Sequence, residues 1–169
     1  SLSRSGKRNG SSLTQVYHFA YNLWGQSPSV KVGTRTLASY TYEDLAGNPE
    51  GSGGGKLLSM TYGNRDSISY TYDELDRLVE TVYNDTGNRI TYTYNSEGVL
   101  AKLTYSSASA VISTYHFEYD SLGRLIRSAE YDGSNTLVQR TEHIYDAYNR
   151  LSSQSWGFGT TTYGESYTY

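Results

Sequence analysis

Hydrophobic and polar residues alternate along most of the chain, in short stretches that resemble one another. In residues 68–72 an isoleucine and two tyrosines occupy every second position, with serine and threonine between them. Residues 90–94 and 115–119 show the same alternation of aromatic and polar positions. Because successive side chains of a strand point to opposite faces, each stretch predicts a strand with one aromatic face.

The alternation belongs to a triplet, aromatic–x–Tyr, that returns along the chain. Its final tyrosines are Tyr21, Tyr42, Tyr72, Tyr94, Tyr119, Tyr145 and Tyr169, at spacings of 21, 30, 22, 25, 26 and 24 residues. The copy that ends at Tyr145 has His143 in place of the first aromatic residue. Intervals this regular predict a tandem array of one structural unit.

Four copies continue in the same way after the tyrosine. Asp or Asn follows one residue later, a residue that tolerates positive φ four residues later, and leucine six residues later. These three positions are Asp73, Asp76 and Leu78; Asn95, Gly98 and Leu100; Asp120, Gly123 and Leu125; and Asp146, Asn149 and Leu151. The pattern predicts a β-hairpin in which an aromatic strand, a tight Asx-type turn and a return strand follow one another.

Two alternatives arise within this unit. Residues 73–82 taken alone also fit an amphipathic helix, but glycine at the matching interior position of two other copies argues against it. The return strands carry a second aromatic residue eleven or twelve positions after the motif tyrosine, namely Tyr83, Tyr105, Tyr131 and Trp156. The offset of eleven differs in parity from that of the leucine, so the pattern allows either a β-bulge or aromatic residues on opposite faces.

Two strands per unit over seven units predict an all-β fold, an antiparallel sheet of about 12–14 strands. Open twisted sheets rarely exceed about ten strands without curling, so we expect a curved sheet, part of a shell or spiral. We expect residues 1–12 to be a polar N-terminal linker, residues 13–169 to be the tandem array, and a glycine-rich loop insertion near residues 47–56.

Composition changes this picture in two ways. The chain has 169 residues, of which 19 are tyrosine, with no cysteine and a net charge of −3. The aromatic content and low charge argue against disorder, and tyrosine replaces aliphatic residues as buried material. The absence of cysteine excludes a disulfide scaffold and a thiolate metal site. The mild acidity argues against a nucleic-acid partner, and no apolar run approaches the ~20 residues that a membrane span needs.

Each candidate for chemistry has a structural explanation. His18 and His116 share one position of the repeat, three residues before the motif tyrosine, and no histidine spacing suggests zinc. The acidic pairs Glu43/Asp44 and Asp73/Glu74 fall at predicted turns, where acids cap backbone groups. The glycine run at residues 51–55 lacks the first glycine and the Ser/Thr of a phosphate-binding loop. We therefore expect no enzyme activity, metal or cofactor.

The units resemble the tyrosine–aspartate (YD) repeats of Rhs proteins, Tyr-x-Tyr-Asp-x-x-Gly-Arg-Leu. Residues 117–125 fit this motif with one conservative change, residues 70–78 depart from it only at Asp76, and the resemblance covers roughly residues 15–169. It implies hairpins that spiral into a hollow β-shell. In bacterial Rhs toxins and insecticidal Tc toxin components the shell encloses a C-terminal toxin, and in teneurins it supports cell-surface adhesion. The autoproteolytic core motif of the family, Pro/Asp-Pro-x-Gly-Leu, does not occur in this sequence.

The resemblance implies a non-enzymatic structural segment of a large secreted or cell-surface protein. Its implied partners are neighbouring repeats and other segments of the parent, such as a C-terminal toxin. We also expect self-association at high concentration, and we expect no nucleic acid and no membrane span. The motif positions expected to carry the structure are Tyr21, Tyr42, Tyr72, Asp73, Leu78, Tyr94, Asn95, Gly98, Leu100, Tyr119, Asp120, Gly123, Arg124, Leu125, Tyr145, Asp146, Arg150, Leu151 and Tyr169.

The alternative function is an adhesion module that binds carbohydrate or protein through exposed aromatic residues. Tyrosine joins an apolar ring to a hydroxyl group, which suits interfaces and the stacking of sugar rings. Aromatic residues outside the register of the repeat are the better candidates for such binding, and these are Trp24, Tyr148, Phe158 and Tyr163.

Overall fold

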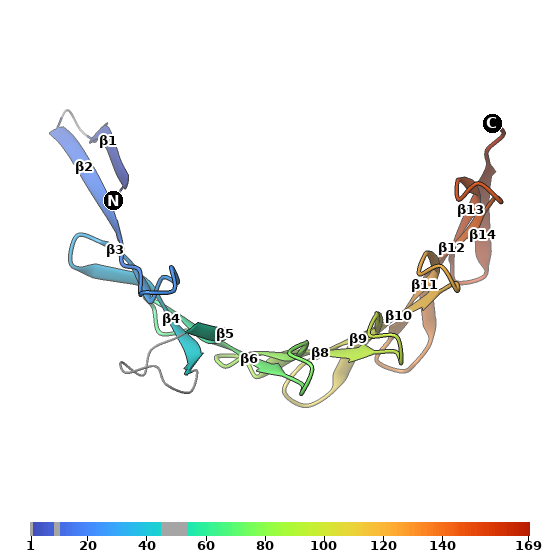
Figure 1. Cartoon of the computed structure of the whole chain (residues 1–169), viewed down its shortest axis with the longest axis horizontal. Helices are drawn as coiled ribbons and strands as arrows, with labels where there is room; N and C mark the ends of the chain where they lie inside the picture. Colours follow the sequence, from blue (N-terminus) through green and yellow to red (C-terminus); the bar gives the residue numbers. More distant parts are fainter. Residues whose placement is uncertain (1, 9–10, 45–53) are drawn as a thin grey trace. The chain divides into compact units, whose positions relative to one another are not determined.

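The chain is entirely β in the part that the structure, a computed structural model, describes: residues 2–8, 11–44 and 54–169. Fourteen strands follow one another in the sheet in the order of the chain, and the pairings are antiparallel (Figure 1). The strands are β1 (Leu2–Arg8), β2 (Ser11–Phe19), β3 (Ser29–Val32), β4 (Arg35–Asp44), β5 (Gly54–Tyr62), β6 (Ser67–Tyr72), β7 (Leu78–Tyr83), β8 (Asn88–Tyr94), β9 (Leu100–Ser106), β10 (Val111–Tyr119), β11 (Leu125–Asp132), β12 (Leu137–Tyr145), β13 (Leu151–Phe158) and β14 (Thr161–Ser166). The all-β class and the sheet of tandem hairpins are confirmed.

The chain divides into two compact units. The first comprises Ser1–Asp76 and Thr81–Asp85, and the second comprises Arg77–Glu80 and Thr86–Tyr169. Within each unit successive strands change direction progressively, so each stretch of sheet is curved in itself, as the run from β8 to β14 shows (Figure 1). This agrees with the curvature expected of an open antiparallel sheet of many strands.

The predicted hairpin turns are present, and local chemistry explains them. After Tyr119, the N–H of Gly123 donates to the carbonyl of Asp120 at 2.9 Å, and the N–H of Asp120 donates to the carbonyl of Arg124 at 3.0 Å. Gly123 has a φ of 75°, which glycine adopts without strain. Positive φ recurs four residues after the motif tyrosine at Gly25, Asp76, Gly98 and Asn149. Residues 78–83 form β7, so the helical alternative for that segment is wrong.

A β-bulge follows several of these turns and resolves the parity of the second aromatic residue. Tyr94 pairs with Leu100 while Thr93 pairs with Lys102, so one extra residue lies in β9 between the two partners. The bulge brings Tyr105 onto the same face as Tyr94, since Tyr105 lies opposite Ile90. The register places Trp156 on the face of its own motif tyrosine in the same manner. Tyr131, whose offset is twelve rather than eleven, lies on the opposite face. Both alternatives left by the sequence therefore occur: the bulge is present in all three of these hairpins, and the hairpin that carries Tyr131 also has its second aromatic residue on the opposite face.

The N-terminal segment differs from the expected linker. Leu2–Arg8 forms β1 and pairs along β2, from Leu2 opposite Tyr17 to Arg8 opposite Ser11. A polar segment can pair in this way because the ladder uses backbone groups, which do not depend on side-chain hydropathy. Residues 54–56 of the expected loop insertion belong to β5, and residues 45–53 lie outside the described part of the chain.

Burial within the described residues is shallow. Ala38, Thr81 and Ala129 are 5–8% exposed, and no large side chain is fully buried. Five of the seven motif tyrosines are half-buried, Tyr21 and Tyr169 being the exposed ones, while threonines between the paired aromatic residues, such as Thr71 and Thr93, are exposed. A sheet that forms one layer cannot bury side chains against a second layer, so its stability depends on contacts between neighbouring hairpins. Those contacts are where the repeat motif acts.

Candidate functional site

The motif tyrosines connect each hairpin to the one before it. In five copies the hydroxyl group donates to a backbone carbonyl at or near the start of the preceding return strand. The bonds run from Tyr42 to Ser27 (3.2 Å), Tyr72 to Leu57 (2.9 Å), Tyr94 to Leu78 (2.7 Å), Tyr145 to Leu125 (3.0 Å) and Tyr169 to Leu151 (3.0 Å). Burial raises the pKa of Tyr42 and Tyr72, which keeps these phenols protonated as donors.

A basic side chain from the preceding hairpin lies over the ring of the same tyrosine. The guanidinium carbon of Arg124 is 4.5 Å from the ring centroid of Tyr145, and that of Arg150 is 4.3 Å from Tyr169. Arg77 lies over Tyr94 at 4.5 Å. All three arginines stand five residues after their own motif tyrosine, so a single repeat position supplies a cation–π contact to the next hairpin.

The motif aspartate holds both its own turn and this arginine. The Oδ1 atom of Asp120 accepts from the N–H groups of Leu122 and Arg124 at 2.9 and 3.0 Å, and its Oδ2 atom accepts from Arg124 Nε at 2.7 Å. Asp146 and Arg150 repeat the arrangement, with Nε to Oδ2 at 2.8 Å. The Arg124 guanidinium lowers the pKa of the Asp120 carboxyl, and the N–H of Arg150 lowers that of Asp146, each assisted by further bonds. We call the set aspartate, arginine and next motif tyrosine the Asp–Arg–Tyr link.

The residue with positive φ in the next turn bonds the basic side chain of the preceding hairpin in two places. Arg124 Nη1 donates to Oδ1 of Asn149 at 2.8 Å, and the ammonium of Lys56 bonds the Asp76 carboxylate. Asp and Asn tolerate positive φ better than other side chains do. The two turns that depart from glycine therefore carry an oxygen that meets the cation of the preceding hairpin.

Sequence reasoning missed one copy of the turn and the role of the arginine. Asn22 Oδ1 accepts from the N–H groups of Trp24 and Gln26, and Gly25 has a φ of 74°, so the hairpin after Tyr21 has the same turn. Asn one residue after the tyrosine and glycine four residues after it were a sufficient signal. The arginine's partner is 21 residues away in the case of Arg124, and only its recurrence at one repeat position could have indicated a contact.

The four candidate ligand residues do not form one site. Trp24 and Tyr148 each stand three residues after a motif tyrosine, at the tip of a turn, and therefore belong to the register of the repeat after all. Phe158 lies at the end of β13 and Tyr163 lies in β14, and both are more than half exposed. Among the four, Phe158 and Tyr163 are close in register, because Tyr163 lies opposite Trp156, two residues before Phe158. These assignments remain predictions.

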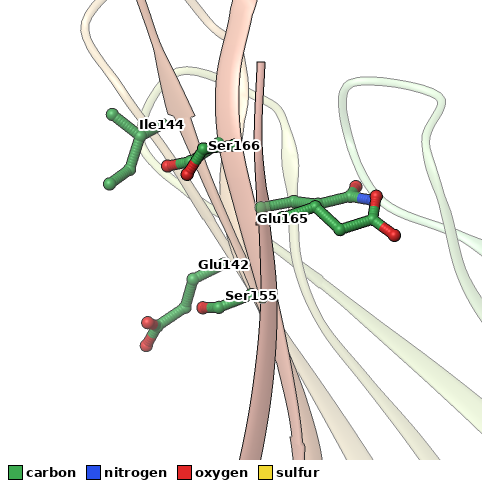
Figure 2. A pocket seen from close by; sticks show the side chains of 8 residues that line it. Glu142, Ile144, Ser155, Glu165 and Ser166 are labelled. Atoms are coloured by element: carbon green, nitrogen blue, oxygen red, sulfur yellow. The ribbon is translucent and has the colours of Figure 1, made fainter.

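Neither the His116 ring nor the hollow across β12–β14 lies in an arrangement of catalytic groups. The His116 ring meets Tyr131 edge-on at 5.3 Å, a packing contact, and no cluster of three metal-ligating side chains occurs among the described residues. A shallow hollow of about 280 Å³ lies across β12–β14, where Glu142, Ile144, Ser155 and Ser166 lie on one side of the strands and Glu165 on the other (Figure 2). Its lining contains serine but no histidine or lysine that could serve as a base. In the part of the chain described, no helix is long and apolar enough to cross a membrane.

Comparisons with known proteins agree with the repeat. No protein-family model matches the chain. It is 34% identical over 150 residues to human (Homo sapiens) teneurin-1, and 30% identical over 141 residues to zebrafish (Danio rerio) teneurin-3. These matches cover 82% and 80% of this chain but 5% of each teneurin.

Solved structures show the same fold. Crystal structures of TcdB2-TccC3 and of TcdB2-TccC3-Cdc42 match the chain with a TM-score of 0.67 at 19% and 18% sequence identity. Each match covers 90% of this chain and 9% of the solved chain. The recurring Tyr-x-Tyr-Asp hairpins, the link between them and the teneurin relatives lead to one assignment: the chain is a YD-repeat protein, related in sequence to the teneurins.

Proposed function

We propose that the chain is a non-enzymatic structural segment of a large secreted or cell-surface protein, in which it forms part of a β-shell. The Asp–Arg–Tyr link is the observation that carries this proposal. Each link uses the most specific residues of the motif to fasten one hairpin to the next, as in Arg124 over Tyr145 at 4.5 Å. Residues that are used in this way build a wall and are not free to bind a substrate.

The small share of each relative that the chain covers supports a role as one segment. The chain spans 5% of the matched teneurins and 9% of the solved toxin chains. Repeat arrays are stabilised by contacts between neighbouring units, so a segment of this kind extends by adding hairpins at its ends. We infer that its partners are other segments of the parent polypeptide, which the shell encloses or presents.

Half-buried aromatic side chains give a second line of support. Tyr92 and Tyr94 on β8 and Phe117 on β10 are half-buried, although no second layer of the described chain covers them. Apolar surface of this kind is stabilised further when another part of the protein covers it. An enclosed segment of the parent polypeptide would supply that cover.

The test is the structure of the full-length parent polypeptide by cryo-electron microscopy. We expect residues 13–169 to lie in the wall of a shell, with density of another segment on one face of the sheet. A parent in which both faces of this segment are open to solvent would overturn the enclosing role. Protease treatment of the intact parent supplies an independent readout, because an enclosed segment should resist cleavage until the shell is unfolded.

A further inference from the structure

The C-terminal strands carry exposed aromatic side chains that the Asp–Arg–Tyr link does not use. Trp156 on β13 lies opposite Tyr163 on β14, with ring centroids 6.3 Å apart and planes inclined by 21°. Phe158 lies one position further along the same face of β13. Phe158 and Tyr163 are 55% and 54% exposed. We call these three residues the aromatic platform.

Two polar clusters flank the platform on the same face of the sheet. On one side, the Glu130 carboxylate accepts from the Tyr115 hydroxyl at 2.8 Å and from Gln139 Nε2 at 2.7 Å. The register places Glu130 opposite Gln139 and Gln139 opposite Phe158, so this cluster shares a row with one end of the platform.

The second cluster lies beyond the other end. The Glu165 carboxylate accepts from the Tyr167 hydroxyl at 2.8 Å and from Gln154 Nε2 at 3.4 Å. Gln154 and Glu165 pair directly and lie two residues from Trp156 and Tyr163, hence on the platform's face. A carboxylate offers about four acceptor positions, so each cluster keeps free acceptors after these bonds.

We propose that this face binds an uncharged oligosaccharide. A sugar ring presents an apolar C–H face, which stacks on Trp156 and Tyr163, and hydroxyl groups at its rim, which bond to Glu130, Glu165 and the two glutamine amides. The rows of the two clusters are separated by four residues along β13, about 14 Å at ~3.4 Å per residue, so the face suits several linked sugars. The two carboxylates disfavour sulfated or sialylated glycans through like-charge repulsion.

This inference is independent of the proposed structural role, because the platform contains no residue of the Asp–Arg–Tyr link. The shell assignment would stand if no sugar bound here. Conversely, a sugar site would stand if the parent protein formed an open spiral instead of a shell.

The experiment titrates the full chain, in a Trp24→Phe background, with cellohexaose, maltohexaose, chitohexaose and mannohexaose, and with a heparin hexasaccharide. Because Trp156 is then the one remaining tryptophan, its fluorescence reports directly on the platform. We expect at least one uncharged hexasaccharide to give a saturable change, and the heparin fragment to give none. Tyr163→Ala should weaken binding about tenfold, the change expected for one stacked ring, and Leu122→Ala, at an exposed turn residue outside the face, should leave it unchanged.

Three outcomes would overturn the proposal. One is the absence of saturable binding by all four uncharged sugars, and another is binding that Tyr163→Ala and Phe158→Ala both leave intact. The third is self-association by light scattering that Tyr163→Ala abolishes, since the platform would then be a contact between copies of the chain. Circular dichroism of each variant, matched to the parent chain, ensures that lost binding reflects the face and not unfolding.

Discussion

The hairpin that follows Tyr94 and the hairpin that follows Tyr119 have the same turn but differ in the link that leads to the next hairpin. Asn95 Oδ1 accepts from the N–H groups of Glu97 and Val99 at 3.0 and 2.9 Å, the same two bonds that Asp120 accepts. Gly98 and Gly123 have φ values of 80° and 75°. The turn is therefore independent of the charge on the Asx residue.

The link differs because two residues change together. Arg124 bonds Asp120 and stacks on the tyrosine of the next hairpin, whereas Val99 at the equivalent position has neither a charge nor a donor. Asparagine supplies the turn oxygen without a carboxylate that would need a cation. The motif thus contains two separable devices: an Asx oxygen and a positive φ make the turn, and a carboxylate and a guanidinium fasten the next hairpin.

The largest expected effect comes from removing a linked tyrosine. Tyr145→Ala removes the ring under Arg124 and the hydroxyl bond to Leu125, and we expect it to lower the local free energy of unfolding by about 3 kcal/mol. Tyr119→Ala removes a ring that has no arginine from the preceding hairpin, so its cost should be about 1 kcal/mol smaller. Hydrogen-exchange mass spectrometry of β10–β13 measures both locally, because a repeat array can unfold in parts.

The control for this pair is Tyr148→Ala, which removes a ring that is 79% exposed and should change exchange protection little. Equal losses for Tyr119→Ala and Tyr145→Ala would show that ring packing alone holds the hairpins together. The Asp–Arg–Tyr link would then make no contribution to the free energy of unfolding.

Local structure of this kind was accessible from the sequence because its causes lie within six residues. Positive φ after each motif tyrosine follows from the conformational tolerance of glycine, asparagine and aspartate, and the structure confirms it at Gly98, Gly123 and Asn149. The alternation of aromatic and threonine positions likewise identified the strand faces. Both rest on chemistry between near neighbours in the chain.

The other features of the fold and of the link depend on contacts between residues that are far apart in the chain, and the sequence pattern does not specify these contacts. The bulges after Tyr94 and Tyr119 are not specified by the sequence pattern, and only strand pairing shows that Tyr105 lies on the face of its motif tyrosine while Tyr131 lies on the opposite face. The arginine link joins residues 21 positions apart, across a return strand and an intervening connection of variable length. Leu2–Arg8 pairs through its backbone, for which its polar side chains give no signal.

Removing the guanidinium tests the link more selectively than removing the ring. Arg124→Ala loses the stacking on Tyr145 and the bond to Asn149, and we expect a local cost of about 1–2 kcal/mol. Arg124→Lys should recover part of this cost, because lysine keeps the charge but lacks the planar fork. The measurement is hydrogen exchange across β11 and β12, with the exchange of β8 as an internal reference. Full rescue by lysine would contradict a role for the guanidinium plane.

Installing the link where it is absent should have a smaller, opposite effect. The double substitution Asn95→Asp and Val99→Arg introduces the missing aspartate–arginine pair into the hairpin that precedes Tyr119. We expect a coupling energy of about 0.5–1 kcal/mol between the two changes. Either substitution alone should be neutral or destabilising, since it leaves a carboxylate or a guanidinium without its partner. A double-mutant cycle from urea midpoints gives the coupling. Additive effects of the two substitutions would show that the existing links form because the sheet brings their residues together and that they contribute no stability to it.

The smallest expected effect is a dependence on acid that separates the two hairpin types. Arg124 lowers the pKa of Asp120 below its ordinary value of 3.8, and the folded state therefore binds the proton less readily than the unfolded state. The stabilisation is fully present above that ordinary value and is lost as the pH falls through the lower, folded value. We expect Asp120→Asn to destabilise the chain at about pH 6 and to lose this effect progressively at acidic pH below 3.8, as the wild-type carboxylate takes up its proton. The urea midpoints of the wild-type protein and of Asp120→Asn, measured at both pH values, give the pH dependence of this stability difference. A difference that is the same at both pH values would show that the charge on Asp120 does not stabilise the link. Asn95→Ala provides the matched comparison, because its turn bonds carry no ionisable group and its cost should be the same at both pH values.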